Sequence, residues 1–454
     1  MKRNHLRYRF YRVIAAQVSA LTRYYDKVVY FAAQPSDDGL LLDLVDAPAR
    51  SIAADTGELE DLSDERDRRT AVLMNGNANY TFDFQATLVD LLPRLSRTSR
   101  VVLVTYNAYL EPLFRLANRL GLRRGAVPQT FITRSDLESI AELSGYDIVR
   151  LRPTGFFPWR LGGLGSMLNR LCAGLPVLRW LSLAAVVVLR PRKSQQETLP
   201  SLSIIVPARN ERGNIASAVA RLPDLGCPME VVFVEGHSDD GTWEAIEALC
   251  ASYDGPLQLR ALRQTGRGKA DAVRLGFGAA RHELLVILDA DLTMPPEHLP
   301  RFYQAYVEGH ADFINGSRLV YPMEGDAMRS LNRLGNIFFA KAVSAVLDQR
   351  IGDTLCGTKL LARHDYARMI AWRRDFGDVD PFGDFELLFP AAVLGLGIAD
   401  VPVRYRARTY GSTNIRRFRD GLRLFGMTWR GLVQVRMAGH LESVRTGNGA
   451  GARE

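Results

Sequence analysis

Short apolar runs that stop abruptly at polar residues are the feature that most constrains the fold of this chain. Three of them lie in the second half of the sequence, at residues 202–206, 230–234 and 284–288. Runs of this length, separated by helical patterns, are typical of buried strands in a sheet covered by helices. The sequence therefore predicts an open α/β sheet in this half.

The residues that follow these runs are acidic, small or amide-bearing. The first run leads into Pro207-Ala208-Arg209-Asn210-Glu211, the second into Glu235-Gly236-His237-Ser238, and the third into Asp289-Ala290-Asp291. In open α/β sheets, ligands bind at the carboxyl ends of the strands, so these residues predict a site. Two carboxylates one residue apart point to the same face and suit Mg²⁺ or Mn²⁺ beside a diphosphate. An isolated Asp-x-Asp, by contrast, usually marks a solvated turn.

A fourth segment adds cations to this predicted site. Gly266-Arg267-Gly268-Lys269 gives flexible backbone and two positive charges directly before an expected helix, with Asp271 close behind. Such a segment suits an anionic ligand. The four segments together predict a pocket for a nucleotide-diphospho-sugar.

The order of these motifs resembles that of family 2 glycosyltransferases of GT-A fold, most closely the dolichyl-phosphate mannose synthase-like branch. The resemblance covers roughly residues 200–413. Further motifs that carry it are Asn315-Gly316-Ser317-Arg318, Asp353-Thr354-Leu355-Cys356-Gly357-Thr358-Lys359, Phe385-Glu386-Leu387-Leu388, Val401-Pro402-Val403-Arg404-Tyr405 and Arg408-Thr409-Tyr410-Gly411.

The resemblance implies a metal-dependent inverting transfer of a hexose and a role for individual residues. Asp289 and Asp291 would hold the metal. The residues implied on the donor nucleotide-sugar are Pro207, Asn210, Glu211, Glu235, Ser238, Lys269, Asp271 and Asp289. The residues implied in catalysis are Asp291, Asp384, Arg318 and Arg408, with Glu386 and Gly357 on the acceptor side.

This chain also departs from the family pattern. Val234-Glu235-Gly236-His237-Ser238 stands where the family commonly has Val-Asp-Asp-Gly-Ser, which leaves the nucleobase open. Thr293 stands where a glutamine is frequent, and Gly411-Ser412-Thr413-Asn414 lacks a phosphate-binding lysine. The acceptor therefore stays open between a polyprenyl phosphate, another lipid and a glycan.

Five acids between residues 375 and 386 bear on that choice. A sugar hydroxyl acceptor needs a carboxylate base, for which Asp384 is the candidate, whereas a lipid phosphate is already ionised and needs none. Capping of the helix that follows is the competing interpretation of these acids, and it accounts for all but one of them. Two other functions stay open for the chain: a non-catalytic nucleotide-sugar-binding module and an S-adenosylmethionine-dependent methyltransferase.

The first half shows a second α/β pattern, with strands expected at residues 28–31, 40–44, 71–74 and 101–104. It resembles class I S-adenosylmethionine-dependent methyltransferases, chiefly in residues 72–80 and 101–107. The glycine-rich turn of that family is missing, because Ala32-Ala33-Gln34-Pro35-Ser36 follows the first strand. We expect a scaffold without cofactor binding, with residual ligand binding as the alternative. Asp55 lies where such a fold meets adenine or is merely a turn residue.

The carboxyl-terminal part carries a basic helical pattern. The spacing of the apolar residues predicts a helix with one stripe, formed by Ile415, Phe418, Leu422, Phe425, Trp429 and Leu432. Arginines crowd the same segment, so the stripe faces either an anionic peripheral membrane surface or the catalytic domain.

Composition limits the partners and the compartment. The net charge of +8 and pI near 9.4 favour anionic partners, of which nucleotides and phospholipids fit the motifs better than nucleic acid. The four cysteines show no paired spacing, and the apolar run from Trp180 to Leu189 is too short to span a bilayer and is expected to be a core strand. We expect a cytoplasmic protein, in part at the inner face of the plasma membrane.

The expected organisation is therefore two α/β domains. Residues 1–192 form a methyltransferase-like, Rossmann-type domain, and polar residues 193–200 between two prolines form a linker. Residues 201–413 form the GT-A glycosyltransferase domain, and residues 414–454 form the basic amphipathic helix and a flexible tail.

Overall fold

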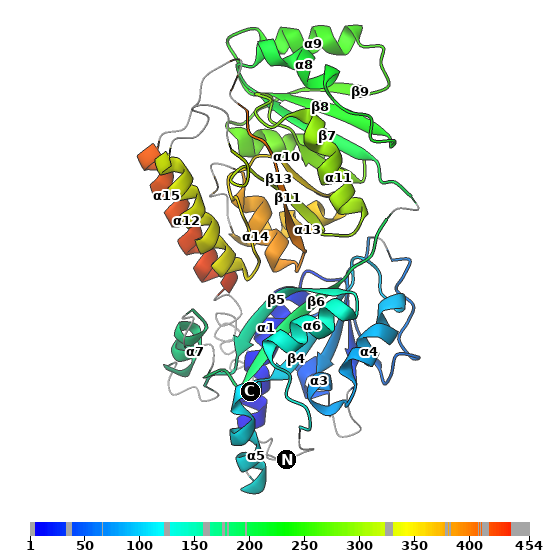
Figure 1. The fold of residues 1–454 in the computed structure, drawn as a ribbon, viewed down its shortest axis with the longest axis vertical. Coiled ribbons are helices and arrows are strands. Elements are labelled where there is room, and N and C mark those ends of the chain that lie inside the picture. The colour runs from blue at the N-terminus through cyan, green and yellow to red at the C-terminus, as the bar shows by residue number, and fades with distance from the viewer. Residues whose placement is uncertain are drawn as a thin grey trace, which may run out of the picture. The chain divides into compact units, whose positions relative to one another are not determined.

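The computed structural model describes residues 5–32, 39–65, 67–121, 128–157, 164–174, 178, 181–195, 198–322, 330–376, 380, 383–406, 408, 410 and 417–436. Two compact units divide the chain. Unit 1 comprises Met1–Lys193 with Val393–Gly395 and Leu432–Glu454, and unit 2 comprises Ser194–Ala392 with Leu396–Gly431. Figure 1 shows the sheet and helices of each unit.

Unit 1 is built on a six-stranded sheet in the order β2-β1-β3-β4-β6-β5. Its strands are β1 (Lys27–Phe31), β2 (Arg50–Ala53), β3 (Thr70–Asn75), β4 (Arg100–Tyr106), β5 (Tyr146–Thr154) and β6 (Ala184–Pro191). The first four run parallel, and β6 lies antiparallel between β4 and β5. The strand order reverses between β1 and β3, so their carboxyl ends form a topological switch point.

Alternate residues of these strands enter two different cores. Val28 and Tyr30 pack with α1 (His5–Thr22) and α2 (Leu40–Leu44), while Val29 and Phe31 pack with α4 (Phe84–Leu91) and α6 (Arg134–Leu143). This alternation follows from the two-residue period of a strand, and it gives three layers. The other helices of unit 1 are α3 (Asn77–Tyr80), η1 (Leu92–Arg94), η2 (Ala108–Leu110), α5 (Glu111–Arg119) and α7 (Leu164–Gly174).

Two expectations for unit 1 need correction. Residues 40–44 form α2 rather than a strand, because Leu-Leu-Leu-Asp-Leu contains strong helix formers and no β-branched residue. The strand expected from Trp180 to Leu189 is β6, which the structure begins at Ala184 and continues through the buried Arg190. Arg190 does not end the strand, since Asp147 of the neighbouring β5 accepts a hydrogen bond from its guanidinium at 2.5 Å.

Two features expected in unit 1 have different outcomes. The turn that lacks glycine, at Ala33-Gln34-Pro35-Ser36, lies outside the described residues. Asp55 is a turn residue, because its carboxylate accepts hydrogen bonds from the backbone N–H groups of Gly57 and Glu58 at 2.7 and 3.0 Å.

Unit 2 is built on a seven-stranded sheet in the order β13-β11-β12-β10-β7-β8-β9. Its strands are β7 (Leu202–Ala208), β8 (Met229–Glu235), β9 (Gln258–Arg263), β10 (Leu284–Ile287), β11 (Phe313–Ser317), β12 (Lys359–Ala362) and β13 (Ile398–Pro402). The neighbours β10, β7, β8 and β9 are parallel, and β12 is antiparallel to both β10 and β11. The three apolar runs expected to be strands are thus confirmed, and their carboxyl ends share one edge.

Helices cover both faces of this sheet. The helices of this unit are η5 (Arg212–Asn214), α8 (Ile215–Ala220), α9 (Thr242–Ser252), α10 (Lys269–Ala279), η6 (Pro296–His298), α11 (Leu299–Val307), α12 (Ser330–Leu347), α13 (Arg363–Phe376), α14 (Phe385–Val393) and α15 (Arg417–Gly431). The π-helical turn η7 (Leu432–Arg436) that follows belongs to unit 1. Helix α10 packs so closely that a Cβ on Gly276 would stand 2.5 Å from Ile205 of β7. None of the described helices is both long and apolar enough to cross a membrane.

Helix α15 packs against α12, and Figure 1 shows the two side by side. The buried face of α15 contains Leu424 and Met427, whereas Leu422, Phe425 and Trp429 are 77%, 60% and 60% exposed. Leu422, Phe425 and Trp429 of the expected stripe therefore do not pack on unit 2, although the helix does. The first residue of that stripe, Ile415, lies outside the described residues.

Candidate functional site

The two acids of the Asp-x-Asp motif follow β10 directly. The strand ends at Ile287, and Leu292 adopts a left-handed φ of 50° that turns the chain away after Asp291. Thr293 fixes Asp291, because its hydroxyl and its backbone N–H donate to Oδ1 of Asp291 at 2.7 and 3.1 Å. Threonine at this position therefore orients a carboxylate.

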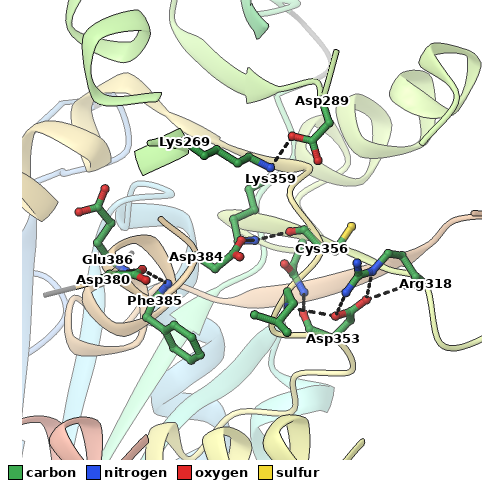
Figure 2. A network of polar contacts seen from close by, with 12 residues as sticks. Lys269, Asp289, Arg318, Asp353, Cys356, Lys359, Asp380, Asp384, Phe385 and Glu386 are labelled. Atoms are coloured by element: carbon green, nitrogen blue, oxygen red, sulfur yellow. Dashed lines mark hydrogen bonds and ion pairs between the residues drawn. The ribbon is translucent and has the colours of Figure 1, made fainter. Parts of the chain in front are cut away.

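Each of these acids has a cation as partner. Lys269, the first residue of α10, pairs with Asp289 (Figure 2), and Nη2 of Arg408 lies 2.6 Å from Oδ2 of Asp291. Burial favours the neutral form of Asp289, but the charge and hydrogen bond of Lys269 outweigh it and hold the pKa of Asp289 below its usual range. Burial likewise opposes the charge on Lys269, yet Asp289 and Asp384 raise the pKa of Lys269 above its ordinary value. Both groups are therefore charged at neutral pH.

The loops after β7 and β8 form the neighbouring edge of the site, with Pro207 near the end of β7. The backbone N–H of Asn210 donates to Ser238 Oγ at 3.0 Å, and Ser238 N–H donates to Glu235 at 2.5 Å. Glu211 is buried, accepts a hydrogen bond from Asn214 at 2.7 Å, and lies 4.0 Å from Arg408. Burial raises the pKa of Glu211, and the nearby Asp291 adds to this shift.

Asp271 closes the loop that precedes α10. Its carboxylate lies against Gly266, where no side chain would fit, and accepts a hydrogen bond from Gln264 at 2.9 Å. Gln264 also lies against Gly236, whose missing side chain leaves room for it. His237 has a left-handed φ of 60°, and its Nε2 lies 2.9 Å from the carbonyl oxygen of Gly266. Residues 235–237, which differ from the family pattern, thus connect the loop after β8 to the loop before α10.

Arg318 and Asp353 form a buried bidentate pair (Figure 2). Nε and Nη2 of Arg318 donate to the two oxygens of Asp353 at 2.7 and 2.9 Å. Burial alone would raise the pKa of Asp353, but Arg318 outweighs it and lowers that pKa. The same carboxylate accepts a hydrogen bond from Leu355 N–H at 3.0 Å. Arg318 therefore fixes the start of the segment 353–359.

That segment lies directly against the donor-side acids. A Cβ on Gly357 would overlap both the carboxylate of Asp289 and the ammonium of Lys269. Two residues later, the fully buried Lys359 reaches Asp384 at 2.5 Å and the carbonyl of Cys356. Figure 2 shows these two lysine–aspartate pairs close to each other. Burial raises the pKa of Cys356 to about 11, so its thiol is protonated at neutral pH.

The acidic stretch before α14 has divided roles. Asp380 caps the helix, because its carboxylate accepts hydrogen bonds from the N–H groups of Phe385 and Glu386 at 2.7 and 3.0 Å. Glu386 itself lies 3.5 Å from Arg274 and from Arg373. Asp384 points instead to Lys359, so capping does not explain its side chain.

Sequence reasoning missed three partners in this site. Lys359, Asp353 and Asp380 were not expected to act on other site residues. A lysine at the head of the apolar strand Lys-Leu-Leu-Ala is a signal that could have revealed the first, because a buried ammonium needs a carboxylate. The lysine-free segment Gly411-Ser412-Thr413-Asn414 lies outside the described residues.

The chain matches the model of Glycosyl transferase family 2 over residues 203–369. A dolichyl-phosphate hexose transferase of Haloferax volcanii is 32% identical over 225 residues, which cover 49% of this chain and 90% of that relative. A dolichol-phosphate mannosyltransferase of Pyrococcus furiosus is 35% identical over 122 residues, covering 26% of this chain and only 33% of that relative. The chain thus spans most of the first relative and a third of the second.

Solved structures are more distant. Glucosyl-3-phosphoglycerate synthase of Mycobacterium tuberculosis, in complex with Mn²⁺ and uridine diphosphate, aligns at a TM-score of 0.36 with 17% identity, covering 55% of this chain and 85% of that one. The family match and the 90% coverage of the Haloferax relative establish the family without this structure. The chain belongs to glycosyl transferase family 2 and is a glycosyltransferase.

Proposed function

We propose that this enzyme moves a hexose from a nucleotide-diphospho-sugar to a polyprenyl phosphate, with inversion at the anomeric carbon, in a GT-A domain formed by residues 201–413. The observation that carries the proposal is the contact between the donor and acceptor segments. Gly357 lies against the Asp289–Lys269 pair, and Lys359 of the same segment binds Asp384. A sugar bound at the first pair is thereby next to the acceptor segment.

On the donor side, the oxygen ligands fit a divalent cation. Carboxylates are preferred by Mg²⁺ and Mn²⁺, and Asp289 and Asp291 would hold either ion beside the diphosphate. The ion supplies Lewis-acid stabilisation of the negative charge that develops on the leaving nucleoside diphosphate. Arg408 adds a cation from the other side, since it already contacts Asp291.

The nucleotide end of the donor is assigned to the loops after β7 and β8 and before α10. The residues proposed there are Pro207, Asn210, Glu211, Glu235, Ser238 and Asp271. Several of them hold one another in place through loop hydrogen bonds, which supports a preformed pocket. Arg318 acts through Asp353 by positioning the acceptor segment, because both oxygens of Asp353 face it.

The pairing of Asp384 favours a phosphate acceptor. One oxygen of the Asp384 carboxylate is already bound to the buried ammonium of Lys359, whereas a phosphate needs no base. Relatives named for dolichyl phosphate and undecaprenyl phosphate support the same choice. In Asp384→Asn, transfer to a polyprenyl phosphate should fall by less than about tenfold, and transfer to a hydroxyl acceptor by about a hundredfold or more.

A polyprenyl phosphate would be met at a membrane surface. Exposed apolar side chains on both α12 and α15 support a peripheral contact, namely Leu334, Phe338, Leu422, Phe425 and Trp429. The exposed Arg423 and Arg430 suit anionic headgroups. We place this surface at the inner face of the plasma membrane. Co-sedimentation with anionic vesicles at low and high salt tests the contact, and absence of binding at low salt contradicts it.

For residues 1–192 we propose a methyltransferase-like scaffold that has lost its cofactor. The parallel order β2-β1-β3-β4, with its reversal between β1 and β3, supports the Rossmann-type half of this proposal. Residues 32–36, which follow β1, contain no glycine that would let backbone approach a cofactor, and this supports the loss. Residues 193–200 then act as a linker.

A transfer assay tests the main proposal. The enzyme is incubated with Mg²⁺ or Mn²⁺ and a panel of nucleotide-sugars, with a polyprenyl phosphate or an oligosaccharide as acceptor. Release of nucleotide that depends on the polyprenyl phosphate is the expected result. If nucleotide release depends only on the oligosaccharide, the acceptor is a glycan and not a polyprenyl phosphate. If the product retains the anomeric configuration of the donor, inversion is excluded.

A further inference from the structure

Both donor-side carboxylates are occupied by cations of the same chain. Lys269 binds Asp289, and Arg408 binds Oδ2 of Asp291 at 2.6 Å, while Thr293 takes Oδ1 of the same residue. The backbone at Gly357 lies against Oδ2 of Asp289. A divalent cation that arrives alone must therefore displace a lysine and an arginine.

The charge balance opposes that displacement. Lys269 carries a full charge and stands beside the carboxylate that the cation needs, so it repels the cation at short range. Two like charges a few ångströms apart in such a site cost several kcal/mol. Displacing Lys269 and Arg408 would also break their ion pairs with Asp289 and Asp291 in a partly buried site.

A diphosphate changes this balance because it offers the two cations new partners. Resting on the proposed function, we infer that Lys269 and Arg408 are exchangeable counter-cations. They neutralise Asp289 and Asp291 in the free enzyme and move to the diphosphate when the donor binds. The site then takes a divalent cation together with the diphosphate and binds the cation weakly alone.

The placement of both cations suits this exchange. Lys269 opens α10, an 11-residue helix whose first N–H groups can also face an anion, and it follows Gly268 at a φ of 90°. The backbone before Arg408 is anchored, since Arg406 N–H donates to the carbonyl of Thr293 at 2.9 Å. The Tyr410 hydroxyl donates to Asp240 at 3.2 Å on the other side. Arg406 and Tyr410, two residues to either side of Arg408, are thus both held by hydrogen bonds.

Calorimetric titration with Mn²⁺ alone tests the inference without any turnover. Lys269→Met should bind Mn²⁺ at least about tenfold more tightly than the wild type, because the competing cation is gone. Lys341→Met removes the same charge from the exposed face of α12 and should bind Mn²⁺ as the wild type does. Arg408→Met is a second variant that should also gain affinity, should Lys269→Met fail to fold.

A second titration in the presence of uridine or guanosine diphosphate completes the test. The nucleotide that binds should raise the wild-type affinity for Mn²⁺ by about tenfold or more, and by less in Lys269→Met. Tight Mn²⁺ binding by the wild type alone, or no gain in either variant, would overturn the inference. Because these readouts need no acceptor, a gain of Mn²⁺ affinity in Lys269→Met together with no sugar transfer by the wild type would sink the proposed function and leave the exchange standing.

Discussion

The two sheets present very different side chains at the carboxyl ends of their parallel strands. In unit 2 the described residues there include Glu235, Asp289 and Asp291, with cations arranged around them. In unit 1 the described residues after β3 and β4 are amides such as Asn75, Asn79 and Asn107. The described ends of β3 and β4 in unit 1 thus carry neutral polar groups, whereas the ends of β8 and β10 in unit 2 carry charges.

The difference extends to what these groups bind. Asn79 is fully buried and uses its amide to hold the chain, donating to the Thr130 carbonyl and accepting from Tyr106 N–H, both at 2.9 Å. The carboxylates Asp289 and Asp291 of unit 2 pair with lysine and arginine side chains. Amides tied to backbone stabilise a loop, whereas charges paired with side chains can be released to a ligand. The fold alone therefore does not decide which sheet reacts.

The largest expected effect comes from removing the charges that distinguish unit 2. Asp289→Asn with Asp291→Asn should reduce sugar transfer by about a thousandfold or more, because the leaving group loses its metal-borne stabilisation. Asn75→Ala, at the corresponding edge of unit 1, should leave transfer within about twofold. Transfer rates of the two variants measure the contrast, and an active double variant would end it.

Breaking the Arg318–Asp353 pair should lower the stability of unit 2 and leave that of unit 1 unchanged. Asp353→Asn leaves a buried guanidinium without its counter-charge and should lower the free energy of unfolding of unit 2 by about 3 kcal/mol at pH 7. The folded-state pKa of Asp353 is depressed, so its contribution is present above about pH 4 and is lost as the pH falls through that lower pKa. Denaturant unfolding at pH 7 and at a pH below the folded-state pKa of Asp353 measures this contribution.

The matched control for that experiment is Asp254→Asn, which removes an exposed acid of the same unit. It should unfold like the wild type at both pH values. A destabilisation of Asp353→Asn that persists undiminished at the lowest pH would show that the carboxylate charge is not its cause.

The contact between donor and acceptor segments predicts a smaller effect on rate. Gly357→Ala places a methyl group against Asp289 and Lys269, whose ends can shift, so transfer should fall by about tenfold with the fold retained. Gly278→Ala, in α10 with open space around it, should transfer at the wild-type rate. Equal rates for the two variants would separate Gly357 from the reaction.

The smallest expected signal comes from unit 1. Titration with S-adenosylmethionine should give no binding heat at ligand concentrations up to about 1 mM. The reason is the sequence after β1, since residues 32–36 lack the glycine that close approach of backbone to a cofactor requires. Saturable binding in the micromolar range would remove the contrast between the two sheets.

Sequence patterns could place most strands but not the partners of the charges. Apolar runs and their polar ends identify β7, β8 and β10, since a run of this kind has few alternatives. Residues 40–44 form a helix. The expectation of a strand was wrong because the apolar pattern of a short leucine run does not by itself distinguish a strand from a helix. The pairing of Lys359 with Asp384 spans 25 residues and depends on how β12 and α14 pack.

Helix α15 shows the same limit for faces of a helix. Its sequence contains two apolar rows, one with Leu422, Phe425 and Trp429, the other with Leu424 and Met427. Periodicity shows that the first row exists, but only the packing on α12 decides that the second row is buried. The first row is the larger, and it is nevertheless the one left in solvent.

The burial of Lys359 has a consequence for how this site can change over time. Loss or neutralisation of Asp384 leaves an ammonium with no exposed surface without its counter-charge and lowers the stability of the fold, and loss of the lysine does the same to the carboxylate. Single substitutions at either position must cross a disfavoured intermediate, whereas a joint replacement by two neutral side chains of similar volume need not. The two positions should therefore vary together among homologous chains, as one inherited unit.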